Sequence, residues 1–249
     1  MPNHETLPLL LKQLGLPCMY AQWEEVSGQA EKEGWTYPGY LETLVSRELA
    51  NRQQNRIQRH IREARLPPGK TLDSFDFKTS KSVNAAQIKA LADNPDWVRK
   101  AENLMIFGPS GVGKTHLASA IAYRLIEKGM RALFTPTTVL VQKLQQARRD
   151  YKLNDYLNKL SLVNILILDD IGYVKKDEAE TSVLFELIAQ RYENCSLIIT
   201  SNQPFKDWDQ VFPDNIMAVA AIDRLVHHAT IVNITDESYR RHRNNVKHH

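Results

Sequence analysis

The spacing of apolar residues divides this 249-residue chain into two regions. Over residues 1–66 the apolar positions recur every three or four residues, which is the period of a helix packed along one face. The pattern predicts three helices there, over residues 7–16, 19–33 and 37–65. We therefore expect a small all-helical N-terminal domain, followed by a linker over residues 67–80 that opens with two prolines and a glycine. Within that linker, residues 71–77 are expected to be extended and to pack two aromatic side chains against the next domain.

Residues 81–249 show a different pattern, in which short apolar runs alternate with segments of helical spacing. The apolar runs are predicted to be strands over residues 103–107, 131–134, 163–168, 195–200 and 230–234. The helices are predicted over residues 84–92, 114–128, 137–150, 178–193 and 215–227. Because strands alternate with helices, the predicted fold class is α/β, a three-layer core around a mostly parallel five-stranded sheet.

A glycine-rich loop joins the first predicted strand of this core to the helix that follows it. Residues 108–115 read Gly-Pro-Ser-Gly-Val-Gly-Lys-Thr, which fits the phosphate-binding loop of nucleotide-binding proteins. Glycines let successive backbone N–H groups point into one concavity, and the helix start adds its positive dipole end, so a polyphosphate is favoured there. The predicted ATP contacts are Gly108, Pro109, Ser110, Gly111, Val112, Gly113, Lys114, Thr115 and His116. Lys114 is expected to reach the β and γ phosphates, and the Thr115 hydroxyl to hold Mg²⁺.

Polar residues end two of the other predicted strands. Asp169 and Asp170 follow an apolar run, at the edge where ligands bind in open α/β sheets. We predict that Asp169 holds Mg²⁺ and that Asp170 orients or deprotonates the attacking water. Asn202 ends the next strand and has two interpretations: a contact to the γ-phosphate or the attacking water, or a turn residue before Pro204.

Two arginine-containing segments near the C-terminal end also carry candidate chemistry. Arg224 follows a hydrophobic helix and is either an arginine that stabilises transition-state charge from outside the loop or an ion-pair partner of Asp223. The basic tail includes Arg240 and Arg241, which either reach phosphates or DNA or are simply solvated.

Charge is unevenly distributed, although the net charge of +3 is small. Residues 1–46 carry two Lys/Arg and six Asp/Glu, whereas residues 47–69 carry six arginines and two glutamates. The six arginines are Arg47, Arg52, Arg56, Arg59, Arg62 and Arg65. Because Arg52, Arg56 and Arg59 share one face of the predicted helix, the run is either a solvated face or a surface that contacts DNA phosphates.

The remaining composition excludes several classes of protein. No apolar run approaches the ~20 residues of a membrane span, and the N-terminus lacks the pattern of an export signal, so we expect a cytoplasmic protein without a membrane partner. Cys18 and Cys195 lie far apart in the sequence and are predicted to be buried thiols, not a disulfide framework. The eight histidines lack metal-ligand spacing.

Together these motifs resemble those of the AAA+ ATPases, within the branch that contains IstB, DnaC and DnaA. The loop at 108–115 matches Walker A, Leu-Asp-Asp-Ile-Gly at 168–172 matches Walker B, and Ile-Thr-Ser-Asn at 199–202 matches sensor 1. Residues 222–225 match the arginine-finger segment, and residues 238–241 match sensor 2, with Arg240 assigned and Arg241 as the alternative. The N-terminal segments Leu-Lys-Gln-Leu-Gly-Leu-Pro, Tyr-Leu-Glu-Thr-Leu and Arg-Glu-Ala-Arg-Leu-Pro are similar to IstB, so the resemblance covers nearly the whole chain.

The resemblance implies a Mg²⁺-dependent helper ATPase of a transposon. Such a protein assembles on duplex target DNA as a homo-oligomer with nucleotide at the subunit interfaces, and it recruits and stimulates a partner transposase. A DnaC-like helicase loader, which binds a replicative helicase and single-stranded DNA, remains an alternative, as does a P-loop kinase acting on a small molecule. The placement of Asn202 and Arg224 argues against the kinase.

Overall fold

The protein is described here by a computed structural model, which covers residues 6–172, 178–203, 208, 215–236 and 238. The chain divides into two compact units, Met1–Arg59 and His60–His249, and each is described by itself. The predicted division into residues 1–66, 67–80 and 81–249 remains a prediction. No helix among the described residues is long and apolar enough to cross a membrane.

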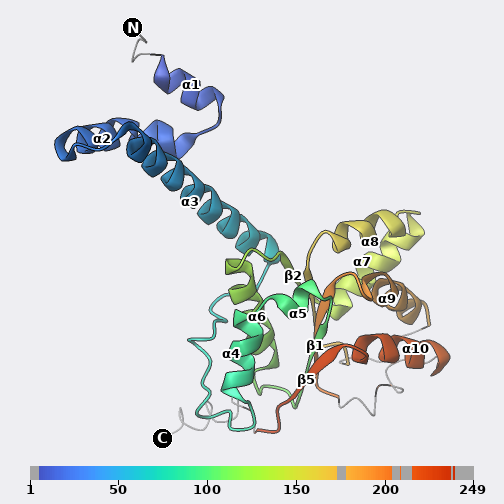
Figure 1. The fold of residues 1–249 in the computed structure, drawn as a ribbon. Coiled ribbons are helices and arrows are strands. Elements are labelled where there is room, and N and C mark those ends of the chain that lie inside the picture. The colour runs from blue at the N-terminus through green and yellow to red at the C-terminus, as the bar shows by residue number, and fades with distance from the viewer. Residues whose placement is uncertain (1–5, 173–177, 204–207, 209–214, 237, 239–249) are drawn as a thin grey trace, which may run out of the picture. The chain divides into compact units, whose positions relative to one another are not determined.

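The N-terminal unit is helical, as predicted. It contains α1 (Leu7–Gln13), α2 (Pro17–Glu33) and most of α3 (Tyr37–Ala64), all shown in Figure 1. α2 begins two residues earlier than predicted, because a proline is favourable in the first helical turn, and it ends at Gly34 in the left-handed conformation. A small core forms from Leu11, Met19, Val26 and Leu44.

Glu48 of α3 joins this helix to the start of α2. Glu48 is 3% exposed, and its carboxylate accepts hydrogen bonds from the backbone N–H groups of Cys18 and Met19, at 2.8 and 3.0 Å. These groups lie in the first turn of α2, where N–H groups have no partner within the helix. The Arg52 guanidinium pairs with Glu48 at 2.9 Å and donates to the Gly15 carbonyl at 2.7 Å. Arg52 therefore has a structural role that was not predicted from the sequence, and its contact with DNA remains a prediction.

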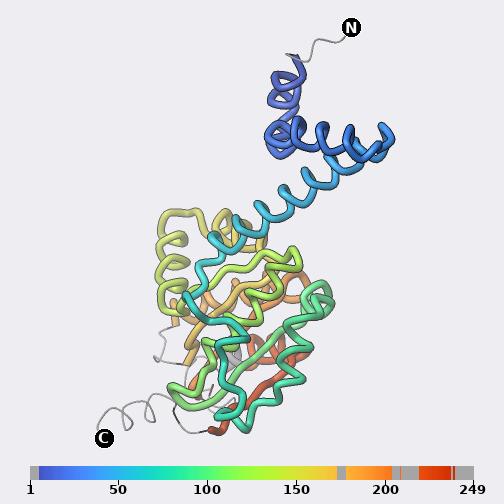
Figure 2. Tube along the Cα trace, turned by 90° about the vertical axis from the view of Figure 1, so that its left-hand side faces the viewer, coloured from blue at the N-terminus to red at the C-terminus, as the bar shows by residue number. Residues whose placement is uncertain are grey.

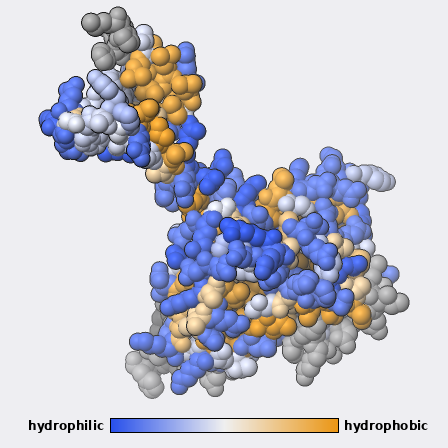
Figure 3. Space-filling view, in the orientation of Figure 1, coloured by the Kyte–Doolittle hydropathy of each residue, from blue (hydrophilic) through white to orange (hydrophobic). Residues whose placement is uncertain are grey.

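Apolar side chains also lie on the surface of the N-terminal unit, where Figure 3 shows them gathered in orange. The exposed leucine and valine side chains on α1, directly after it and on α3 are Leu9, Leu10, Leu14, Leu41, Val45 and Leu49. Of the apolar residues that recur along α3, Leu44 is buried, whereas Leu41, Val45 and Leu49 are exposed.

The C-terminal unit contains a five-stranded sheet in which every strand pairing is parallel. The strands are β1 (Asn103–Phe107), β2 (Ala132–Pro136), β3 (Ile165–Asp169), β4 (Ser196–Ser201) and β5 (Ala229–Asn233). Their order across the sheet is β2-β3-β4-β1-β5. All five lie within two residues of the predicted runs, so the predicted α/β sheet is confirmed.

Helices cover both faces of this sheet, which gives three layers (Figure 1). One face packs against α7 (Thr137–Arg149), α8 (Leu153–Ser161), α9 (Glu178–Arg191) and α10 (Asn215–Val226). The other carries α4 (Ala85–Asp93), α5 (Asp96–Arg99) and α6 (Lys114–Glu127). Neither α5 nor α8 is among the predicted helices. Both are short, and neither has a side-chain N-cap, the usual start signal in a sequence.

Two further features of the C-terminal unit bear on the predictions. The segment that follows α3 runs along the α/β core and leads to α4, as Figure 2 shows in cyan. Cys195 is a free thiol, as is Cys18 in the N-terminal unit, but each is half-buried and not buried as predicted.

Candidate nucleotide-binding site

The loop between β1 and α6 has a backbone that requires glycine at two positions. At Gly108, φ is 151°, and a Cβ atom would lie 2.4 Å from the Ile234 carbonyl oxygen. At Gly113, φ is 100°, and a Cβ atom would lie 2.8 Å from the ring of Phe75. Atoms essentially never approach so closely, so larger residues are excluded at both positions. The loop is thereby held against β5 on one side and against Phe75 on the other.

Lys114 turns back into this loop. Its side chain is buried, and the ammonium donates to the carbonyl oxygens of Gly108 and Pro109 at 2.8 and 2.9 Å. A buried ammonium needs such acceptors, because its desolvation is otherwise costly. The cation is therefore already held at the mouth of the loop, where the sequence predicts a polyphosphate.

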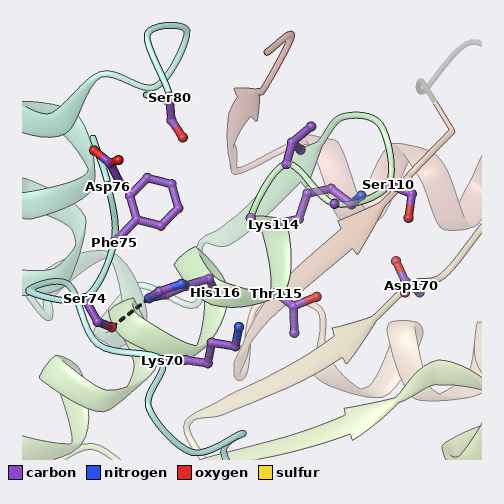
Figure 4. A pocket seen from close by; sticks show the side chains of 13 residues that line it. Lys70, Ser74, Phe75, Asp76, Ser80, Ser110, Lys114, Thr115, His116 and Asp170 are labelled. Atoms are coloured by element: carbon purple, nitrogen blue, oxygen red, sulfur yellow. Dashed lines mark hydrogen bonds between the residues drawn. The ribbon is translucent and has the colours of Figure 1, made fainter. Parts of the chain in front are cut away.

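A cavity of about 730 Å³ opens beside the loop (Figure 4). Predicted residues on its walls are Ser110, Gly111, Val112, Gly113, Lys114, Thr115, His116 and Asp170. The rest of the wall comes from Lys70, Ser74, Phe75, Asp76 and Ser80. Sequence reasoning missed these five, because they belong to the predicted linker. The two aromatic residues in that stretch were the available signal. Their expected packing is confirmed by the contact of Phe75 with His116. The expected extended backbone over residues 71–77 is wrong, because this stretch folds into turns, with the Phe75 N–H bonded to the Leu72 carbonyl.

Contacts with the first turn of α6 hold the 69–80 segment at this cavity. The Nε2 atom of His116 lies 2.8 Å from the Thr71 carbonyl, to which it donates, and 3.1 Å from Ser74 Oγ. Phe75 packs edge-on against His116, with ring centroids 5.2 Å apart. Burial lowers the pKa of His116, as does the nearby Lys70, while the hydrogen bond to Thr71 opposes the shift. The neutral form of His116 is thus favoured.

Three threonines surround Asp169, at the end of β3. Thr115 Oγ1 donates to its carboxylate at 2.9 Å, and Thr200 Oγ1 donates to the same carboxylate at 2.7 Å. Thr137 donates to the Asp169 backbone carbonyl at 2.9 Å. Burial raises the pKa of Asp169, and the bonds from Thr200 and Thr115 act against that rise. The structure thus brings the two predicted metal ligands, Thr115 and Asp169, into direct contact.

Asp170 lies on the wall of the cavity with an unusual backbone conformation. Its φ is 56°, in the left-handed region that aspartate tolerates better than most residues. Two hydrogen bonds to β4 hold this turn: Asp170 N–H donates to Thr200 Oγ1 at 2.9 Å, and Ile171 N–H donates to the Thr200 carbonyl at 3.0 Å. Thr200 therefore contacts both predicted acids, a role that was not predicted from the sequence.

Asn202 and Arg224 are not on the cavity wall of their own chain. Asn202 follows β4, and no described residue is hydrogen-bonded to its buried Oδ1 atom. The Arg224 guanidinium lies 4.9 Å from the centroid of Phe185, a cation–π contact, and among described residues it forms no ion pair with Asp223. Arg240 and its alternative Arg241 lie outside the described residues.

The six arginines assigned to DNA lie on α3 or just after it, and none lines the cavity. Arg47 donates to Gln22 at 3.2 Å, and Arg52 is held by Glu48 and Gly15. Arg56, Arg59, Arg62 and Arg65 are exposed.

Residues 9–247 match the sequence profile of a family described as IstB-like ATP binding protein, so the match covers nearly the whole chain. The chain belongs to this family. The IstB-like assignment agrees with the resemblance drawn from the motifs.

Relatives of this IstB-like protein have names that refer to insertion sequences. An insertion sequence ATP-binding protein of Sinorhizobium fredii is 53% identical over 235 residues, which are 94% of this chain and 79% of the relative. The insertion sequence IS21 ATP-binding protein of Pseudomonas aeruginosa is 38% identical over 237 residues, which are 95% of this chain and 89% of the relative.

Among solved structures, this IstB-like chain is similar to the DnaC helicase loader. The crystal structure of that protein aligns with a TM-score of 0.54 and 24% identity, over 67% of this chain and 97% of that one. At this identity the likeness concerns the fold alone, and it agrees with the predicted α/β core.

Proposed function

We propose that this IstB-like protein is a Mg²⁺-dependent ATPase that helps an insertion sequence to move, by assembling on duplex DNA and recruiting its transposase. The observation that carries the ATPase part is the cavity beside the loop at 108–115, with Lys114, Thr115 and Asp170 on its walls. A phosphate chain in this cavity meets the ammonium of Lys114 and the N–H groups at the start of α6.

The donor set at the end of β3 fits Mg²⁺. Among the described residues there is no cluster of three or more His, Cys, Asp or Glu side chains that suits a metal. Mg²⁺ does not need one, because it binds one or two protein oxygens together with phosphates and water. The adjacent oxygens of Thr115 and Asp169 provide that pair. Bound there, Mg²⁺ neutralises charge on the phosphates.

Hydrolysis then depends on Asp170. Its carboxylate accepts a proton from a water molecule as that water attacks the γ-phosphorus. The bond from the γ-phosphorus to its bridging oxygen breaks, and ADP and inorganic phosphate leave. Asn202 orients either the water, which donates to its Oδ1 atom, or the γ-phosphate, which accepts from its Nδ2 group. No described residue is hydrogen-bonded to that Oδ1 atom.

Arg224 completes the site of a neighbouring subunit. It does not line the cavity of its own chain, and Phe185 supports it from one side. An arginine that neutralises charge in the next subunit's site makes hydrolysis depend on assembly. ATP accordingly promotes a homo-oligomer with nucleotide between subunits.

The DNA and transposase roles rest on the family and on α3. The relatives carry insertion-sequence names, and α3 presents exposed arginines suited to phosphate contacts. The helicase-loader alternative has support only from the fold, because the similarity to DnaC is at 24% identity.

The proposal is tested by measuring phosphate release with ATP and Mg²⁺, with and without duplex DNA, alongside gel filtration of the same mixtures. We expect turnover that requires Mg²⁺ and an ATP-dependent assembly on DNA. A wild-type protein that neither binds nor hydrolyses ATP contradicts the ATPase. A protein that hydrolyses ATP but ignores duplex DNA and the transposase encoded by the same element contradicts the helper role alone.

A further inference from the structure

We propose that Lys70 is a second phosphate-binding lysine of the nucleotide site, supplied by the segment that follows α3. This inference rests on the proposed nucleotide function. It assigns a ligand, the di- or triphosphate of the bound nucleotide, to a residue that lies outside the phosphate-binding loop.

The position of Lys70 is the first argument. Lys70 lines the same cavity as Lys114 and Thr115. Figure 4 shows its side chain below His116 and Thr115, with the nitrogen pointing up towards these two residues. Thr115 marks the phosphate end of the site, because its hydroxyl contacts Asp169. Phe75 and Asp76 lie farther along the wall, together with Ser80 (Figure 4).

The backbone on both sides of Lys70 is fixed. The Gly69 carbonyl accepts a hydrogen bond from Ser74 Oγ at 2.8 Å, and the Thr71 N–H donates to the same hydroxyl at 3.0 Å. The Thr71 carbonyl accepts from His116 at 2.8 Å. A side chain on such an anchored turn is pre-organised, so less conformational freedom is lost when a ligand binds.

The charge of Lys70 is a further argument, after its position and its anchored backbone. Its side chain is half-buried, and among the described residues it forms no hydrogen bond or ion pair. Asp76 is the acidic residue of the cavity wall that lies nearest to Lys70 in the sequence. Its carboxylate already accepts hydrogen bonds from the Thr79 hydroxyl and the Lys78 N–H. A partly desolvated ammonium without an anionic partner is unfavourable, and a phosphate oxygen supplies that partner.

Lys70 also differs from Lys114 in what it connects. Lys114 belongs to the loop, whereas Lys70 lies shortly after the end of α3 at Ala64. A nucleotide held by both lysines joins the loop to the segment that leads from the arginine-bearing helix. Nucleotide occupancy then adds a further contact to a segment that His116 already anchors.

The test compares ATP and ADP affinity by titration calorimetry in the wild-type protein and three variants of the full chain. Lys70→Met removes the charge and keeps an unbranched side chain that is one atom shorter, and Lys70→Arg keeps the charge. Lys81→Met is the matched control, since Lys81 is exposed and does not line the cavity. We expect Lys70→Met to bind both nucleotides about tenfold more weakly at low salt, with a smaller loss at high salt. Lys70→Arg and Lys81→Met should stay near wild type.

Melting of the nucleotide-free protein distinguishes a ligand contact from a structural one. Because Lys70 has no described partner, Lys70→Met should leave the melting temperature unchanged. An unchanged ATP affinity in Lys70→Met, beside a wild type that binds ATP, overturns the inference and leaves the proposed function standing. A clear drop in melting temperature overturns it too, since the residue then acts on the fold. A wild type that binds no ATP contradicts both the proposed function and this inference.

Discussion

Thr200 bridges the two acids at the end of β3: its hydroxyl donates to Asp169 at 2.7 Å and accepts from the Asp170 N–H at 2.9 Å. The side chain is fully buried, so this hydroxyl has no competing solvent. It therefore fixes one carboxylate directly and the other through the left-handed turn at Asp170. Thr200 thus supports the relative position of the two acids, together with the bond from Thr115 to Asp169.

The first prediction is that Thr200→Val lowers the rate of ATP hydrolysis by on the order of tenfold, since a hydrogen bond to a charged group is removed. Valine has nearly the same shape, so ATP affinity should change little. Thr200→Ser restores the hydroxyl and should restore most of the rate. Steady-state turnover and ATP affinity are measured on all three proteins. Equal loss in the serine and valine variants contradicts a role for the hydroxyl.

The second prediction concerns the glycine that contacts Phe75. Gly113→Ala should abolish ATP binding and lower the free energy of unfolding, because a Cβ atom at φ 100° would lie 2.8 Å from the Phe75 ring. Gly129→Ala is the control: it has a φ of 90°, with nothing within 4 Å of the added atom. The backbone strain is similar in both, about 1 kcal/mol or more. The difference between their unfolding midpoints measures the clash.

Phe75→Leu provides an internal check on that interpretation. If the clash with the ring causes the effect, the double variant Gly113→Ala/Phe75→Leu should be more stable than Gly113→Ala alone. Strictly additive effects of the two changes would show that the ring and the glycine act independently.

The third prediction is a pH dependence of the N-terminal helices. Burial alone would raise the pKa of Glu48, but the hydrogen bonds from Arg52, Met19 and Cys18 outweigh it, so the pKa is lowered from 4.5. Between pH 4.5 and the lower folded pKa, the unfolded chain therefore binds a proton at Glu48 that the folded chain does not. The stabilisation by Glu48 is complete above that pH and is lost as the pH falls through the folded pKa.

Glu48→Gln should remove this dependence and cost about 1–3 kcal/mol of unfolding free energy near neutral pH. Helix content is followed by circular dichroism during melting of the full chain at several pH values. Glu42→Gln is the control, since Glu42 is an exposed carboxylate on the same helix. A wild type and a Glu48→Gln variant with parallel pH profiles would contradict the role of this carboxylate.

The strands and the loop could be predicted from local patterns, because buried parallel strands are continuous apolar runs and the loop has a fixed spacing of glycines. The same patterns gave no sign of Lys70 or Thr200 as parts of the site. Their roles depend on which segments the fold brings together: Thr200 meets the acids because β4 pairs with β3. Lys70 meets the loop because His116 holds the 69–80 segment. For Arg52 the sequence pattern predicted a contact with DNA phosphates, because three arginines share one helical face. The pattern did not indicate that one of the three, Arg52, pairs with Glu48.

The fourth prediction separates the arginines of α3 by role. Arg56 and Arg62 are exposed, so the double variant Arg56→Ala/Arg62→Ala should weaken binding to all duplex sequences equally. The slope of log affinity against log salt should become less steep by about 0.9 for each phosphate that is no longer neutralised. Arg52→Ala should instead lower the melting temperature, because its bonds to Glu48 and Gly15 disappear. Mobility shifts over a salt series, with melting curves, check both statements. An unchanged salt slope in the double variant contradicts a DNA role for Arg56 and Arg62.

The fifth prediction tests whether Arg224 acts on a neighbouring subunit. Arg224→Ala and Lys114→Ala should each lose ATP hydrolysis, the first by about a thousandfold if the arginine stabilises the transition state. Mixed together, the two inactive proteins should regain part of the activity. In the mixture, an Arg224→Ala subunit still has Lys114 in its own site. A neighbouring Lys114→Ala subunit supplies Arg224 to that site, so the site at this interface is complete. Turnover is measured over a range of mixing ratios. The control is the Arg224→Ala protein alone, at the same total protein concentration. If no ratio restores hydrolysis while both variants still assemble on DNA, Arg224 does not act across the interface.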